Sequence, residues 1–379
     1  MNGERSITRR ALVGGLGAMA ISGTLLPVQT RTVLAQDDGE PLKVAFVYVG
    51  PIGDLGWTYA HDQGRLAIEE AFPNVETAYV ENVPETPAES ERVIRDFAQK
   101  GYKVIFTTSF GYMDPTINVA RDFPDTIFIH ISGYKTAPNV GTGFGKIEEP
   151  RYVAGMIAGQ MTTGPRGYPL LGYVAAFPIP EVIRGINAFT LGVRTVNPAA
   201  TIQVVWTNTW FDPPKERQAA EALLDGGADV IAQHQDTPGP MQAAEDRGKY
   251  GVGYNSDMAP FAPKAVLTCP IWKWGVFYVQ TVKEVLEGTW QPTQYWGGWK
   301  DGVVDLSPIG PMVPDDVKEM ALAEAEKFRS GEQTIFTIFT GPLKDNKGEE
   351  RVAEDVSMTD EELLNMSWFV EGVQGEIPS

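Results

Sequence analysis

Aromatic and acidic side chains recur in the polar segments that follow apolar runs of the chain. The candidate ligand-binding residues are Asp54, Trp57, Phe110, Tyr112, Phe177, Glu181, Trp210, Asp236 and Asp257. Flat rings can sandwich a heterocycle, and carboxylates can accept its ring and exocyclic N–H groups. The same segments hold few cations, so a phosphate would be repelled. The pattern therefore predicts a flat, neutral or weakly basic ligand.

Other interpretations of these side chains stay open. A monosaccharide also stacks on tryptophan and bonds to carboxylates, so it is the main alternative ligand. Each aromatic residue can instead belong to the hydrophobic core. Glu181 can also serve only as a negative charge at the start of a helix.

An enzyme is the competing functional class. The chain has three histidines, His61, His130 and His234, and one cysteine, Cys269, without an evident basic partner. The sequence contains no serine-hydrolase, zinc-protease or phosphate-loop motif. His234 beside Asp236 is the one pair suited to acid–base chemistry, such as that of a nucleoside hydrolase. A neutral imidazole in a binding site explains the pair equally well, so we expect a binding protein without catalytic residues, metal or cofactor.

Strands and helices must alternate along the chain to position these segments. Residues 42–49 are rich in β-branched and aromatic side chains and end at Gly50-Pro51, which is typical of a buried strand followed by a loop. A helix is expected over residues 58–71, and the alternation then continues as far as residue 268. Such alternation predicts parallel sheets, in which ligands bind at the carboxyl ends of the strands.

The pattern of the first half recurs 127 residues later. Pro51-Ile52-Gly53-Asp54 corresponds to Pro178-Ile179-Pro180-Glu181, and Glu91-Arg92 corresponds to Glu216-Arg217. A period of this length is typical of two lobes of one design, because solenoid repeats are much shorter. We therefore predict an α/β fold with two lobes, each a mainly parallel sheet flanked by helices.

Each predicted lobe combines separate parts of the chain. The N-terminal lobe comprises residues 42–145 and about 270–300, and the C-terminal lobe comprises residues 146–269 and about 301–345. Glycines in residues 140–146 indicate a crossover between lobes, and a helix over residues 274–286 should return to the first lobe. Residues 346–379 are predicted to form a polar tail with loose ends, in which residues 363–369 are the one stretch with an apolar period.

The first 35 residues are typical of an export signal. Arg9-Arg10 precede the uncharged residues 11–30, and Val33-Leu34-Ala35 offers small residues for a signal peptidase. Residues 8–12 resemble a twin-arginine signal. An uncleaved membrane anchor is the alternative interpretation.

The remaining 344 residues are strongly acidic, with 27 basic and 48 acidic side chains. Nucleic acids and anionic membrane surfaces need a basic partner surface. The composition therefore excludes both as expected partners.

Seven motifs together resemble the basic membrane protein (BMP) family of substrate-binding proteins. They are Gly50-Pro51-x-Gly53-Asp54-x-Gly56-Trp57, SFGYMDP at 109–115, Arg151-Tyr152-Val153-x-Gly155, PEVIRGINAF at 180–189, WFDP at 210–213, AQHQD at 232–236 and Asn255-Ser256-Asp257-Met258. Their order and spacing extend the similarity over residues 42–345.

This resemblance implies a type I periplasmic binding protein fold, whose two lobes close on a ligand and deliver it to the membrane permease of an ABC transporter. It also implies a monomeric, exported protein, in the periplasm or at the extracellular face of the cytoplasmic membrane. Better-known members bind purine nucleosides, and the branch that this chain resembles is associated with purine bases such as adenine. Gly251-Val252-Gly253 and Trp57-Thr58 depart from the nucleoside-binding pattern, so a free base is the expected ligand.

Overall fold

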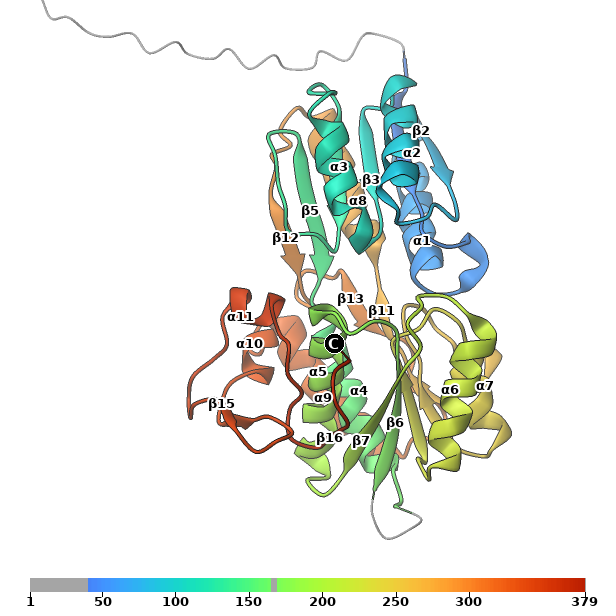
Figure 1. Ribbon diagram of the computed structural model, residues 1–379, viewed down its shortest axis with the longest axis vertical. Helices are drawn as coiled ribbons and strands as arrows, with labels where there is room; N and C mark the ends of the chain where they lie inside the picture. The colour runs from blue at the N-terminus through green and yellow to red at the C-terminus, as the bar shows by residue number, and fades with distance from the viewer. Residues whose placement is uncertain (1–39, 165–168, 379) are drawn as a thin grey trace, which may run out of the picture.

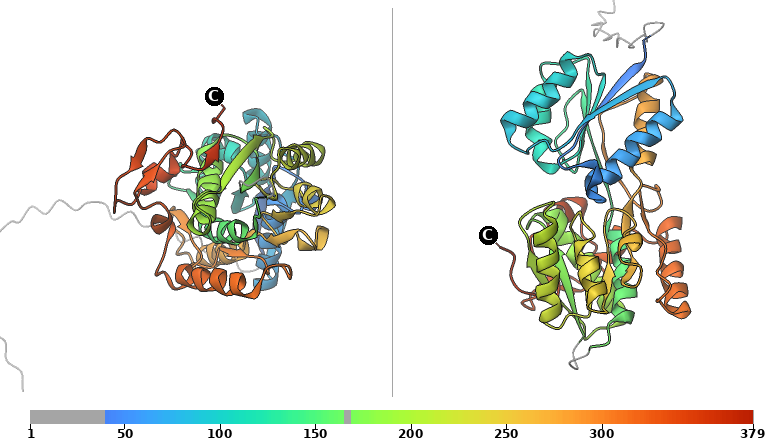
Figure 2. Two further views of the ribbon diagram at one scale, coloured as in Figure 1. Left: turned by 90° about the horizontal axis from the view of Figure 1, so that it is seen from below. Right: turned by 90° about the vertical axis from the view of Figure 1, so that its right-hand side faces the viewer.

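The computed structural model describes residues 40–164 and 169–378. The predicted export signal at residues 1–35 lies outside the described residues. Two lobes lie one above the other and are joined by several connecting segments (Figures 1 and 2). Among the described residues, no helix combines the length and the hydrophobicity needed to span a bilayer.

The first lobe contains a six-stranded parallel sheet in the order β12-β5-β4-β3-β1-β2. Its strands are β1 (Leu42–Val47), β2 (Val75–Val80), β3 (Val104–Thr107), β4 (Ile127–Ile131), β5 (Val140–Gly145) and β12 (Gln294–Gly297). Its helical segments are η1 (Ile52–Asp54), α1 (Trp57–Ala71), α2 (Pro87–Gln99), η2 (Phe110–Tyr112), α3 (Met113–Ala120) and α8 (Trp274–Leu286). Strand β1 is inside the sheet, and Val44 to Val47 are fully buried, which explains the continuous apolar run of this segment.

The second lobe repeats this design with a parallel sheet in the order β10-β9-β8-β6-β7-β16. Its strands are β6 (Leu170–Ala175), β7 (Thr201–Trp206), β8 (Val230–Gln233), β9 (Tyr250–Val252), β10 (Val266–Thr268) and β16 (Val373–Gln374). Its main helical segments are α4 (Glu148–Met161), α5 (Pro180–Val196), α6 (Pro213–Asp225), α7 (Gly239–Asp246), η3 (Ala259–Phe261) and α9 (Asp315–Ser330). When the strands are numbered along the chain within each lobe, and β12 and β16 are left aside, both sheets have the order second-first-third-fourth-fifth. This shared order confirms the predicted repeat.

The chain passes between the lobes three times. It leaves the first lobe after β5, returns through β11 (Pro270–Trp272) into α8, and leaves again after β12 towards β13 (Val304–Leu306). Strands β11 and β13 form a short antiparallel ladder between the lobes (Figure 1). As predicted, α8 packs against α1 of the first lobe, and α9 packs against α4 of the second lobe.

The prediction that residues 140–146 form a crossover is wrong, because residues 140–145 form strand β5. The glycines of this strand make room for aromatic rings. A Cβ atom on Gly143 would lie 2.3 Å from the ring of Phe277, and one on Gly145 would lie 2.6 Å from the ring of Trp272. The crossover follows at Ile147, directly before α4.

The prediction of a loose tail is also wrong for the described residues up to 378. This C-terminal segment packs beside the second lobe (Figure 1) and contains β14 (Leu343–Lys344), β15 (Glu350–Val352), α11 (Asp360–Leu364) and the edge strand β16, while the short α10 (Ile335–Ile338) precedes it. Leu363, Phe369 and Val370 are buried, and the Asn187 side chain of α5 accepts the Val370 N–H at 3.0 Å. Residues 363–369 were the one apolar stretch with a period, and the pattern of the rest of the segment did not reveal its packing.

Helices α4 and α5 approach each other closely in the second lobe. A Cβ atom on Gly155 would lie 2.3 Å from the Phe189 carbonyl oxygen, and one on Gly192 would lie 1.9 Å from the Tyr152 carbonyl oxygen. Glycine at both positions therefore sets the distance between the helices. The contact fixes the position of α5, whose first turn carries Glu181.

Replacing Gly192 by alanine should destabilise the protein. Alanine favours an isolated helix by about 1 kcal/mol, but overpacking at this contact should lower the free energy of unfolding by about 1–3 kcal/mol. Urea denaturation followed by circular dichroism measures the change. Gly53→Ala is the matched control, because a Cβ atom there would meet nothing within 4 Å. A Gly192→Ala variant as stable as the parent would contradict the prediction.

Candidate ligand-binding site

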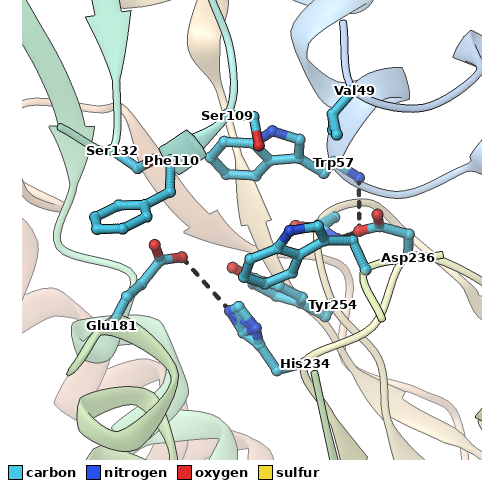
Figure 3. A pocket seen from close by; sticks show the side chains of 11 residues that line it. Val49, Trp57, Ser109, Phe110, Ser132, Glu181, His234, Asp236 and Tyr254 are labelled. Atoms are coloured by element: carbon cyan, nitrogen blue, oxygen red, sulfur yellow. Dashed lines mark hydrogen bonds and ion pairs between the residues drawn. The ribbon is translucent and has the colours of Figure 1, made fainter. Parts of the chain in front are cut away.

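A cavity of about 410 Å³, which includes its open mouth, lies between the carboxyl ends of the two sheets (Figure 3). The first lobe contributes Val49, Trp57, Ser109, Phe110 and Ser132, and the second lobe contributes Glu181, Trp210, His234, Asp236, Tyr254 and Asn255. Because each residue follows the carboxyl end of a strand, the cavity occupies the position that parallel sheets favour for ligands.

Trp57 forms part of the upper wall of the cavity, at the start of α1. Its indole Nε1 donates a hydrogen bond to the Thr108 carbonyl oxygen at 2.6 Å. Edge-on contacts with His61 and Trp274, at ring-centroid distances of 4.2 and 5.7 Å, fix the orientation of the indole. The ring is therefore held rigidly and can offer an apolar surface to a ligand.

Trp210 supplies an indole from the opposite lobe. Its Nε1 donates to Oε2 of Glu85 in the first lobe at 3.2 Å. Phe177 packs edge-on against this indole at 4.8 Å but does not line the cavity. Phe177 thus supports Trp210, although it was predicted to contact the ligand directly.

Asp236 connects the lobes at one side of the cavity. Its Oδ1 accepts hydrogen bonds from the Trp57 backbone N–H at 3.2 Å and from the Asn255 side chain at 2.9 Å. Burial raises the pKa of Asp236 well above its usual value, and the nearby carboxylates of Asp54 and Glu216 raise it further. Gly56 permits the contact, because a Cβ atom there would lie 2.4 Å from the Asp236 Cα.

Asp54 lies behind this contact and does not line the cavity. Its carboxylate accepts the backbone N–H groups of Gly56, Thr58 and Tyr59 at 2.8–3.0 Å, so it caps the start of α1. Burial raises its pKa to about 6, against the opposing effect of these three bonds. Its expected role as a direct ligand contact is therefore not supported by its position.

Glu181 and His234 face each other in the lower part of the cavity (Figure 3), with 3.5 Å between Oε1 and Nε2. Burial raises the pKa of Glu181 to about 7, although Arg184 opposes the shift. Burial and the charge of Arg151 lower the pKa of His234, so its imidazole is neutral. His234 is thus paired with Glu181. The acid–base pair considered from the sequence was His234 with Asp236.

One buried polar atom of the lining residues has no hydrogen-bond partner within the described protein, namely Nδ1 of His234. The hydroxyl of Tyr254 interacts with the Arg151 side chain. The guanidinium of Arg151 lies 3.9 Å from the centre of the Tyr254 ring and holds it from the second-lobe side. Leaving buried polar groups unpaired costs roughly 1–3 kcal/mol each. Nδ1 of His234 is therefore suited to bond with a ligand.

Five of the nine predicted residues line the cavity: Trp57, Phe110, Glu181, Trp210 and Asp236. Tyr112 is buried in the first lobe and donates to the Val83 carbonyl oxygen, and the exposed Asp257 accepts the Ala259 N–H. The predicted set lacks the lining residues Val49, Ser109, Ser132, Tyr254 and Asn255, and it lacks His234, which was considered as half of an acid–base pair or as a neutral imidazole in a binding site. These residues come directly after predicted strands, and this position is the feature of the sequence that could have indicated them.

Metal binding has no support in the described residues. Within residues 40–164 and 169–378, no group of three or more His, Cys, Asp or Glu side chains is arranged to hold an ion. Cys269 is buried, and burial raises the pKa of its thiol to about 12. A thiol in this environment is unreactive.

Comparisons with known proteins agree with this geometry. A purine-binding protein of Brucella abortus is 46% identical over 340 residues, which cover 89% of this chain and 95% of the relative. A protein of Haloferax volcanii, provisionally named an ABC transporter glucose-binding protein, is 45% identical over 352 residues, which cover 93% of this chain and 85% of the relative. An ABC transporter solute-binding protein from Aeropyrum pernix K1 has a similar structure, with a TM-score of 0.69 at 20% identity over 87% of this chain and all of that one.

The two parallel-sheet lobes thus have the type I periplasmic binding protein fold that the resemblance implied. The sequence pattern of the PnrA-like ABC transporter substrate-binding proteins (Bmp) matches residues 42–347. The chain belongs to this family of ABC transporter substrate-binding proteins.

Proposed function

We propose that this protein is the extracytoplasmic receptor of an ABC importer, that it binds a purine base such as adenine between its lobes, and that it delivers the base to a membrane permease. The purine-binding relative at 46% identity supports this ligand class. The expected export signal fits the location, since receptors of ABC importers work outside the cytoplasm. The function is binding and transport, without catalysis.

One observation supports the purine most directly. Indoles from opposite lobes, Trp57 and Trp210, line the same cavity as the carboxyl groups of the half-buried Glu181 and the buried Asp236. Among the described residues that line it, none is a lysine or arginine. Stacking of a base on an aromatic ring contributes roughly 1–3 kcal/mol. With its pKa near 7, Glu181 can accept from an exocyclic amine or, when protonated, donate to a ring nitrogen. An uncharged heterocycle with both donors and acceptors matches this lining.

A monosaccharide is the second candidate, because the Haloferax volcanii relative carries a glucose-binding name. A sugar needs a partner for each buried hydroxyl group. Oδ1 of Asp236 already accepts two internal hydrogen bonds, so the cavity offers fewer free acceptors than its composition suggests. A sugar has more hydroxyl groups to pair than a purine base has N–H groups, so this occupancy weighs more against the sugar.

Closure of the lobes is the proposed binding mechanism. Trp57 bonds to Asp236, Trp210 bonds to Glu85, and the Ser256 hydroxyl donates to the Leu55 carbonyl oxygen, all across the cleft. A ligand that contacts both lobes binds the closed form more tightly than the open form. It therefore shifts the population towards closure. The closed form then presents surfaces of both lobes to the permease.

Calorimetric titration of ligand-free protein tests the proposed ligand. We expect binding of adenine and other purine bases, and no heat of binding with glucose or ribose at the same concentrations. Glucose binding without purine binding would overturn the purine assignment.

Removing the indole of Trp210 should weaken adenine binding. Trp210→Ala should raise the Kd by about five-fold to a hundred-fold, because the stacking surface and the bond to Glu85 are lost. Trp210→Phe should retain most of the affinity. The neighbouring exposed Phe211 does not line the cavity, so Phe211→Ala is the matched control. Equal effects of the two alanine variants would argue against stacking.

The half-buried Glu181 should make stability depend on pH. Its pKa of about 7 lies above its unfolded value, so the folded protein binds more protons between about pH 4.5 and 7 and loses stability as the pH rises. The free energy of unfolding of Glu181→Gln should therefore exceed that of the parent by an amount that grows to about 1–3 kcal/mol as the pH rises through this range. Urea denaturation at several pH values measures the difference, with the exposed Glu350→Gln as control. A difference that does not vary with pH would contradict the assigned shift.

A further inference from the structure

A second cavity adjoins the ligand cavity and is open to solvent. The two cavities share the lining residues Phe110, Ser132 and Glu181. The space of the second cavity, including its opening, is about 1060 Å³. Any ligand group that extends past Phe110 and Glu181 therefore enters this space.

The walls of the second cavity come from three parts of the chain. The first lobe contributes aromatic residues that include Tyr134 and Tyr295, and the second lobe contributes Ile179 and Pro180 at the start of α5. The third wall is helix α11 of the C-terminal segment, through Asp360, Leu364 and Asn365. In Figure 1, α11 lies at the level of the gap between the lobes, beside the lower end of β12.

Large apolar side chains are exposed around this cavity. Phe110, Tyr134 and Leu364 are 36, 55 and 41% exposed, respectively, and all three line it. Apolar side chains that gather in one concave place, with polar groups between them, are typical of a binding site. The lining is therefore suited to an apolar group.

Helix α11 is held firmly enough to act as a wall. Nη1 of Arg184, in α5, donates to the Leu363 carbonyl oxygen at 2.9 Å, and the Leu363 side chain is fully buried. Thr359 and Glu362 form a capping box at the start of the helix. Leu364 is thus presented to the cavity from a fixed position on the second lobe.

The charges of the second cavity disfavour an anion. Among the described residues, its one cationic lining residue is Arg184, whose Nε bonds to the buried Glu148 at 2.5 Å and whose Nη1 bonds to the backbone of α11. Glu181 and Asp360 place carboxyl groups on the same lining. A phosphate or carboxylate would face these groups without a free cation.

We propose that the second cavity binds an uncharged, mainly apolar substituent carried by the heterocycle in the first cavity, and that Leu364 of α11 contacts this substituent. The inference rests on the proposed purine function and extends the ligand class to substituted bases. The C-terminal segment thereby takes part in ligand selection.

Calorimetric titration with four probes tests this proposal: adenine, benzyladenine with its benzyl group on the exocyclic nitrogen, adenosine, and adenosine monophosphate. The parent protein should bind benzyladenine at least as tightly as adenine, and the monophosphate most weakly. Leu364→Glu should raise the Kd of benzyladenine about tenfold or more, because it places a charge against the apolar group, and should change the Kd of adenine less than about twofold. Val356→Glu is the matched control, since Val356 is 52% exposed and does not line the cavity. Circular dichroism checks that both variants fold.

The outcomes separate this inference from the proposed function. Binding of adenine without benzyladenine would overturn the inference and leave the purine function standing. Adenosine binding more tightly than benzyladenine would assign the cavity to a hydroxylated group and also overturn it. Equal weakening of adenine and benzyladenine by Leu364→Glu would mean that α11 acts on lobe closure and not on the substituent. Failure of the folded parent protein to bind either base would overturn the purine function, and the inference with it.

Discussion

The contact between Asp236 and the backbone of Trp57 is the interaction on which the site depends. It joins the carboxyl ends of the two sheets, so that the cavity has walls from both lobes. The contact requires a backbone without a side chain at Gly56 and a buried carboxyl group whose pKa is raised. Asp54 orders the same turn from behind by holding the first N–H groups of α1. The buried carboxyl groups of Asp54 and Asp236 destabilise the folded protein because they lie close together. Carboxyl groups with perturbed pKa values are typical of functional sites.

Much of the fold could be predicted from the sequence, because the local pattern and the tertiary structure agree in the repeated core. The apolar run of β1 and its counterpart in β6 are strands buried on both faces, which have a distinctive composition. Prediction failed where packing overrides local preference. The glycines of β5 accommodate the rings of Phe277 and Trp272, and the residues after 345 fold onto the second lobe through irregularly spaced apolar side chains. Outside residues 363–369, neither feature has an apolar period that would indicate it in the sequence.

The candidate site was predictable as a set of loops, but less so as individual side chains. Trp57 and Trp210 both follow strand ends and both line the cavity. Asp54 follows a strand end as well, yet it caps a helix. Ligand binding and helix capping both favour aspartate at this position, so the sequence does not distinguish them. Tyr112 belongs to the motif that also supplies Phe110, but the η2 turn directs its ring into the core. Small lining residues such as Ser132 carry no compositional signal, because serine is frequent in every polar loop.

The three passages of the chain between the lobes make each lobe discontinuous in sequence. The first sheet is complete only when β12 has joined β5, and the second only when β16 has joined β7. Pairing between such distant segments is typical of slow, cooperative folding. No single cut in the chain separates the two halves, so dividing the protein into independent folding units would require circular permutation or new linkers.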